Sequence, residues 1–235
     1  MMQRGWTGRV GIRVFAIAAI FAAMLPVAAA PGAMAADEED AQGIVDKSRV
    51  TLSGFMRDKD YDFLHRYIRK AKGVLIYPQV LKAGFIFGGS GGNGVLLTRD
   101  SKTGEWSNPA FYTLGSVSFG LQIGGEAAEV VLLVMSQKGV DSLLASKFKL
   151  GGDTSIALGP VGTGAKSDVT ADFISFAKSK GLYAGLNLDG SYLDVRDSLN
   201  KAYYGKEATP VDIIVKRSVS NKGAAPLREE LKKAK

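Results

Sequence analysis

From residue 73 onward, the chain is a series of short apolar runs separated by glycine, proline, asparagine and aspartate. Runs rich in β-branched and aromatic residues with this punctuation are typical of β-strands joined by turns. Many of the 29 glycines fall inside or beside these runs. Glycine weakens a flat strand but is useful where a strand bends sharply or approaches another backbone closely. We therefore expect a strongly curved, glycine-rich antiparallel sheet or a barrel-like core.

The expected strands and helices can be placed by their periodicity. The strands are expected over 73–77, 83–87, 94–99, 111–123, 129–136, 165–170, 173–179, 182–188 and 191–195. Helices are expected over 41–72, with a break at the charged run 57–60, over 137–148 and 196–204, and from Pro210. Because the strands do not alternate regularly with helices, the predicted class is α+β and not a doubly wound parallel sheet.

The first 35 residues have the composition of a secretory leader. Arg4, Arg9 and Arg13 precede an apolar stretch over 14–30, and Ala33-Met34-Ala35 offers a small-x-small cleavage site. An uncleaved membrane anchor is the alternative, although the stretch is short for a span of about 20 residues. We expect cleavage, and hence a periplasmic or secreted protein that can associate peripherally with a membrane.

The sequence predicts one domain after this leader, because the remaining length suits a single core. The expected segments are a signal peptide over 1–35, an acidic N-terminus over 36–40, the domain over 41–216 and a basic, flexible tail over 217–235. The leader holds three of the seven net positive charges and residues 216–235 hold five, which leaves residues 36–215 at about −1. A nearly neutral domain argues against nucleic acid as a partner.

The glycine run 88–94 matches two functional motifs by spacing alone. Gly88-x-Ser90-x-Gly92 fits a nucleophile elbow, and Gly89-x-Gly91-x-x-Gly94 fits a dinucleotide fingerprint. Both motifs require a helix directly after the glycines, whereas residues 95–98 predict another strand. The elbow also needs a histidine, and the single histidine, His65, lies in the N-terminal helical region. We interpret 88–94 as a loop joining two strands and expect no enzyme and no cofactor.

Metal binding is not expected either. One histidine and no cysteine exclude the common zinc sites, and the carboxylates are not spaced as in a calcium loop.

The N-terminal helical region ends in a cluster of cations. Arg66, Arg69, Lys70 and Lys72 follow an apolar stripe, and the first three can share one helix face. An apolar stripe edged by cations is the pattern of a helix that lies on an anionic membrane. A solvated face whose cations complement the helix dipole, above a stripe packed into the core, explains the pattern equally well.

Several strings resemble, in order and density, those of the SYLF domain family, also called Ysc84 actin-binding-like. They are AKGVLI at 71–76, KAGFIFGG at 82–89, GNGVL at 92–96, WSNPAF at 106–111, FGLQIGG at 119–125, GPVG at 159–162 and SKGLYAGLNLDG at 179–190. The resemblance extends over about 41–216.

This resemblance implies a lipid-binding function. Eukaryotic members bind phosphoinositides through a basic, amphipathic N-terminal region, and fungal members also bind and bundle actin. The corresponding region here is 41–72, so Arg66, Arg69, Lys70 and Lys72 are the residues expected to bind lipid headgroups. Bacterial members with a signal peptide lack SH3 or FYVE modules. The expected partner is an anionic phospholipid of the bacterial envelope; actin is not expected there, and a non-catalytic protein-interaction or structural module is the alternative.

Overall fold

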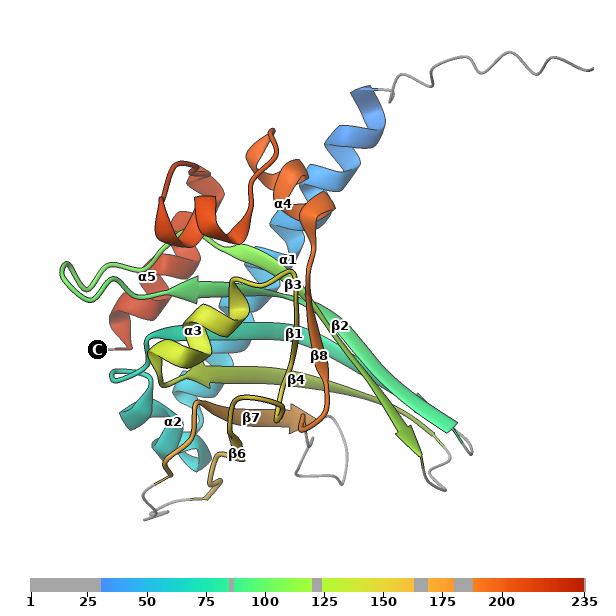
Figure 1. The fold of residues 1–235 in the computed structure, drawn as a ribbon, viewed down its shortest axis with the longest axis vertical. Helices are drawn as coiled ribbons and strands as arrows, with labels where there is room; N and C mark the ends of the chain where they lie inside the picture. Colours follow the sequence, from blue (N-terminus) through green and yellow to red (C-terminus); the bar gives the residue numbers. More distant parts are fainter. Residues whose placement is uncertain (1–30, 85–86, 120–123, 163–168, 180–187, 235) are drawn as a thin grey trace, which may run out of the picture.

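In the computed structural model, eight strands of the described chain form one curled sheet with helices on both faces (Figure 1). The structure describes residues 31–84, 87–119, 124–162, 169–179 and 188–234. The strand order is β5-β8-β3-β2-β1-β4-β7-β6, and all neighbours are antiparallel except β6 and β7. The predicted α+β class and strongly curved sheet are confirmed.

The elements have the following bounds. The strands are β1 (Gly73–Gly84), β2 (Phe87–Thr98), β3 (Ala110–Phe119), β4 (Gly124–Val134), β5 (Lys147–Lys149), β6 (Ile156–Leu158), β7 (Phe173–Ser179) and β8 (Tyr192–Val195). The helices are α1 (Pro31–Arg57), α2 (Asp62–Tyr67), α3 (Gln137–Leu143), α4 (Asp197–Tyr204) and α5 (Ala225–Lys233). Short turns of helix lie at η1 (Lys59–Tyr61), η2 (Val211–Val215) and η3 (Lys222–Ala224).

Both faces of the central sheet are buried. Val74 and Ile76 point to the face covered by α1, α2, α4 and α5, whereas Leu75 and Tyr77 point to the face covered by α3 and η2. Figure 1 shows α1 behind the sheet and α3 in front of it. Because side chains alternate across a strand, burial of both faces gives the uninterrupted apolar runs seen in β1 and β4.

The predicted loop over 88–94 is wrong, because these residues lie inside β2. The neighbouring strand β1 contains Pro78 in a bulge, where its register against β2 shifts between Ile76 and Leu81. The bulge brings the β1 backbone against Gly92 and Gly94: an added Cβ would lie 2.1 Å from the Gln79 oxygen and 2.4 Å from the Ile76 oxygen, respectively. Close backbone approach, and not a loop, accounts for these glycines.

The helix predictions hold in part. The break after Arg57 is confirmed, since η1 separates α1 from α2. Helix α1 also includes 36–40, which the sequence assigned to a separate acidic N-terminus. Helix α3 ends at Leu143, and Phe148 belongs to strand β5. Gly205 ends α4 with a φ of 67°, as predicted.

The C-terminal segment differs from the predicted flexible tail. Residues 225–233 form α5, which packs against α1 and buries Leu227 and Leu231. The folded unit therefore continues to residue 234 and does not end at 216. Residues 1–30 of the predicted leader, which spans 1–35, and most of the expected strands 165–170 and 182–188 lie outside the described residues, whereas 31–35 begin α1.

Candidate functional site

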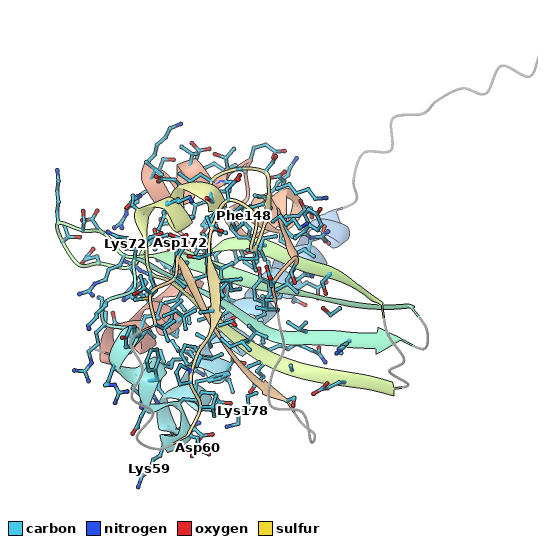
Figure 2. The ribbon with its side chains drawn as sticks, turned by 60° about the horizontal axis from the view of Figure 1, so that its bottom comes forward. Lys59, Asp60, Lys72, Phe148, Asp172 and Lys178 are labelled. Atoms are coloured by element: carbon cyan, nitrogen blue, oxygen red, sulfur yellow. The ribbon has the colours of Figure 1, made fainter. Side chains whose placement is uncertain are left out.

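The four predicted lipid-binding residues follow one another at the junction of α2 and β1. Arg66, Arg69 and Lys70 are exposed, and Lys72, directly before β1, is half-buried. Figure 2 shows Lys72 at the end of the sheet away from the projecting strand ends. The structure therefore brings all four residues to one end of the molecule.

The apolar stripe of this region is buried. Phe63, Leu64 and Ile68 are at most 2% exposed, and the Phe63 ring lies 6.2 Å from that of Phe176 on β7. The stripe of α1 is buried in the same way. Of the two interpretations of the stripe, the fold supports packing into the core. Within 61–72, the exposed residues are Arg66, Arg69 and Lys70.

Ring contacts hold two of these cations over the surface. The Lys70 Nζ lies 5.1 Å from the centre of the Tyr67 ring, and the Arg66 Cζ lies 5.8 Å from that of Phe63. Phe63 and Tyr67 are themselves stacked, with their centres 4.0 Å apart. Exposed cation–π contacts of this kind contribute about 0.5–1 kcal/mol each, so they orient the two cations at the surface.

Lys70 and Lys72 also line a cleft of about 480 Å³ together with two arginines that the sequence did not single out, Arg99 and Arg217. We call it the Arg99–Arg217 cleft. Its walls come from the α2–β1 junction, the loop between β2 and β3, the start of α3 and the chain around the end of η2. The lining residues are Lys70, Ala71, Lys72, Thr98, Arg99, Asp100, Ser101, Gly104, Gln137, Val140, Ile214, Val215 and Arg217.

Arg99 braces the cleft between two of its walls. Its backbone N–H donates to the Lys72 oxygen at 2.7 Å, which extends the pairing of β2 with β1. Its Nη1 donates to the Arg69 oxygen at 2.7 Å and its Nε donates to the Gly104 oxygen at 3.3 Å. The guanidinium is therefore held in place by backbone oxygens.

Arg217 forms the opposite wall from an unusual backbone conformation. Its φ is 52°, and it is the one non-glycine residue with positive φ in the described chain. Its Nη2 donates to the Glu105 oxygen at 3.3 Å and lies 3.8 Å from Asp100 Oδ2. Arg217 thus ties the end of η2 to the β2–β3 loop.

Asp100 is the one carboxylate among the described residues that line the cleft. Its Oδ1 accepts hydrogen bonds from the backbone N–H groups of Thr103 and Lys102, both at 2.8 Å. These bonds, from Thr103 first, lower the pKa of Asp100 below its ordinary value. Asp100 therefore remains ionised and organises the loop, while the four cations around it outnumber it.

No sequence signal could have joined Arg99 and Arg217 to the predicted cations. Arg99 follows a strand, where a basic residue is unremarkable, and Arg217 falls in the segment expected to be a flexible tail. The two arginines reach the predicted cations only through the path of the β2–β3 loop and the packing of the C-terminal segment.

The two motifs at the glycine run have no structural support. Ser90 Oγ lies 2.7 Å from Ser116 Oγ on β3, and β2 continues to Thr98 without a helix. His65, on α2, is hydrogen-bonded through Nε2 to the Phe55 oxygen at 2.9 Å and lies 3.6 Å from Asp62. Within the described ranges, no group of three or more histidine and acidic side chains could hold a metal ion. None of the described helices is long and apolar enough to cross a bilayer.

The described chain is thus an α+β unit with a curled sheet and a group of cations at one end. A family model for Ysc84, described as "Las17-binding protein actin regulator", matches residues 115–234. The chain therefore belongs to the Ysc84 family, whose defining unit is the SYLF domain.

Curated relatives agree with this assignment. The chain is 37% identical over 166 residues to an SH3 domain-containing protein of Schizosaccharomyces pombe, covering 68% of this chain and 37% of the relative. It is 34% identical over 169 residues to Protein YSC84 of Saccharomyces cerevisiae, covering 68% and 35%. It is 32% identical over 152 residues to SH3 domain-containing YSC84-like protein 1 of Mus musculus, covering 63% and 44%.

The chain thus spans less than half the length of these relatives. Another relative, from Saccharomyces cerevisiae, is named LAS seventeen-binding protein 3, and the family description adds actin regulation; none of these names states an enzymatic reaction. No solved structure matches the chain.

Proposed function

We propose that this chain is a non-catalytic envelope protein that docks peripherally on anionic phospholipid through Arg66, Arg69, Lys70 and Lys72. The supporting observation is that these cations lie together at one end of the molecule while the apolar side chains beside them are buried. Arg69, Lys70 and Lys72 form no ion pair with any residue in the described part of the chain. Their charge is therefore available to a partner.

The docking is electrostatic in this proposal. Each basic residue near an anionic bilayer contributes about 1 kcal/mol, and the contribution falls within a Debye length of about 10 Å at 0.1 M salt. Because the helical stripe is packed in the core, no inserted helix adds to this affinity. Binding should therefore require anionic lipid and should weaken steeply as salt is raised.

Vesicle co-sedimentation tests the residues. The processed chain, residues 36–235, would be compared with the variant Arg66→Gln, Arg69→Gln, Lys70→Gln, Lys72→Gln on phosphatidylglycerol-containing and on neutral phosphatidylcholine vesicles. A matched control removes four exposed lysines elsewhere: Lys147→Gln, Lys149→Gln, Lys201→Gln, Lys206→Gln. We expect the first variant to bind anionic vesicles at least about tenfold more weakly and the control to bind nearly normally. Equal effects of the two variants, or none, would refute the proposed site.

A second candidate, a protein-interaction module, is favoured by a different surface. A groove of about 380 Å³ lies between α1 and strands β1 and β4, lined in part by Val50, Pro78 and Ala127. Val50 is 56% exposed, and Leu81, which pairs with Ala127 in the sheet, is 55% exposed. Exposed apolar side chains of this kind mark contact surfaces. If neither kind of vesicle binds the processed chain, this surface becomes the preferred site of action.

A further inference from the structure

We infer that the Arg99–Arg217 cleft binds a phosphomonoester group. The inference deepens the proposed lipid docking, and its membrane-bound form rests on that proposal. It concerns a different task, however: Arg66 and Arg69 attract any anionic surface, whereas the cleft selects one chemical group on that surface.

The cleft concentrates positive charge from distant parts of the chain. Lys70 and Lys72 come from the α2–β1 junction, Arg99 from the end of β2, and Arg217 from the end of η2. Asp100 is the one carboxylate among the described residues that line the cleft. Its Oδ1 accepts hydrogen bonds within the β2–β3 loop, and its Oδ2 lies near Arg217. Four cations against one anion leave a site whose charge suits a multiply charged ligand better than a singly charged one.

The donors of the cleft suit phosphate oxygens. A guanidinium presents several N–H groups in a planar fork that matches phosphate. Arg99 uses Nε and Nη1 on backbone oxygens, and its Nη2 has no partner among the described residues. The Lys72 ammonium likewise has no hydrogen-bond partner in the described part of the chain. The cleft therefore offers both a rigid donor, the Arg99 guanidinium, and a mobile donor, the Lys72 ammonium.

A phosphomonoester meets these donors better than a phosphodiester does. Its second pKa is about 6, so at neutral pH it carries about −1.5 to −2 charges on three strong acceptor oxygens. The phosphodiester of an ordinary phospholipid carries a single charge, and two of its oxygens are esterified. The excess of cations thus favours the monoester.

The backbone of Arg217 supplies an independent observation. It occupies the left-handed conformation just after a helical segment, where glycine is the preferred residue. A long charged side chain at such a position is unfavourable for the fold, and unfavourable backbone conformations concentrate at binding sites. Here the strained residue is one that places a cation in the cleft.

The surroundings of the cleft favour a lipid as the source of the phosphomonoester. Val215 on its lining is 58% exposed, and Arg69 is joined to the cleft through its hydrogen bond with Arg99. A membrane that Arg66 and Arg69 approach would therefore meet the mouth of the cleft. A soluble phosphomonoester shares the same chemistry, so the test separates the two sources.

The test compares phosphatidic acid, a phosphomonoester lipid, with phosphatidylglycerol, a phosphodiester lipid, in phosphatidylcholine vesicles of equal surface charge. The key variant is Arg217→Gly, which removes the cation while giving the position its preferred residue; its thermal unfolding midpoint is measured to confirm that it folds. Lys72→Gln provides a second cleft variant, and the double variant Arg66→Gln, Arg69→Gln serves as the control outside the cleft.

We expect the processed chain to bind phosphatidic acid vesicles about tenfold more tightly than phosphatidylglycerol vesicles. Arg217→Gly and Lys72→Gln should reduce this ratio to about two or less. The control should weaken binding to both lipids and keep the ratio. A titration of glycerol 3-phosphate, followed by NMR of the backbone amides of 99–104, should give shifts that Arg217→Gly abolishes.

The possible outcomes separate the two proposals. A ratio near one in the unaltered chain, with no response to glycerol 3-phosphate, overturns the cleft and leaves electrostatic docking intact. A ratio that survives both cleft variants also overturns it. Absence of vesicle binding together with an Arg217-dependent response to glycerol 3-phosphate refutes the membrane function and supports the cleft as a site for a soluble phosphomonoester.

Discussion

At the scale of single residues, Asp172 shows how one carboxylate joins three segments. Its Oδ1 accepts from Ser136 Oγ, and its Oδ2 accepts from the backbone N–H of Ser155 at 2.9 Å and from its Oγ at 3.1 Å. The hydrogen bond from Ser136 first, and then that from the Ser155 backbone, lower the pKa of Asp172. The carboxylate thereby fixes the start of α3 and the loop before β6 to the start of β7.

This arrangement predicts a pH-dependent contribution to stability. A folded-state pKa below the unfolded value of about 3.9 means that the folded chain favours the ionised form. The contribution is complete above the unfolded pKa and disappears as the pH falls through the folded pKa. We expect Asp172→Asn to lower the free energy of unfolding by about 1–2 kcal/mol at pH 7, with a smaller loss near pH 3.

Urea denaturation at the two pH values measures this effect. Asp153→Asn is the matched control, because Asp153 is an exposed carboxylate nearby whose side chain makes no described hydrogen bond. The control should leave stability within about 0.5 kcal/mol of the unaltered chain. A loss from Asp172→Asn that is the same at pH 3 as at pH 7 would show that its charge is not what matters.

At the scale of elements, the contact between β1 and β2 accounts for the glycine run that resembles a motif. A Cβ at position 94 would lie 2.4 Å from the Ile76 oxygen and 2.5 Å from the Tyr77 ring, both in the well-packed part of the sheet. We expect Gly94→Ala to destabilise the fold by about 2–3 kcal/mol, since overpacking displaces backbone here and not a flexible side-chain tip. Thermal or urea unfolding measures the change.

Gly115 on β3 provides the comparison for Gly94. It also lies in the central sheet, but a Cβ there would meet nothing within 4 Å. Gly115→Ala should be neutral or stabilising by about 0.5 kcal/mol, because alanine reduces the entropy of the unfolded chain. If both substitutions destabilise equally, glycine is required along the whole sheet for its curvature, and the bulge in β1 is not the cause.

Element by element, the sequence predicts what local pattern determines. The break after Arg57, the stop at Gly205 and strand β7 all follow from charge, backbone freedom and alternation. The extension of β2 through 88–94 was missed because none of those seven positions carries the apolar side chain that marks a strand. Helix α5 was missed because its stabilisation comes from two buried leucines against α1, which is a tertiary contact.

The candidate site was predictable to a similar extent. Four cations close together in sequence could be recognised before the structure was known, but not whether their apolar stripe was buried. Arg99 and Arg217 could not be assigned to the site from the sequence, because 118 positions separate them and Arg217 falls in the segment expected to be a flexible tail. Spacing along the chain reports helix faces, whereas a cleft between loops depends on how the whole chain packs.

At the scale of the whole molecule, charge is distributed unevenly. The acidic run 37–40 is exposed on α1, and the cationic cleft lies beside the β2–β3 loop. In Figure 1 the start of α1 and the green loop between β2 and β3 lie on opposite sides of the molecule. An anionic surface would attract one side and repel the other, so the proposed docking has a defined orientation.

Single-cysteine labelling tests this orientation, because the chain has no cysteine of its own. Ser101→Cys lies on the cleft and Asp40→Cys on the acidic turn, and both positions are exposed. With an environment-sensitive dye and lipids that carry a quencher in the headgroup region, the label at 101 should be quenched on anionic vesicles and the label at 40 should not. Neutral vesicles should affect neither label. Quenching at 40 as strong as at 101 would mean that the molecule binds without preferred orientation, since a single cationic docking face holds the α1 start away from the bilayer.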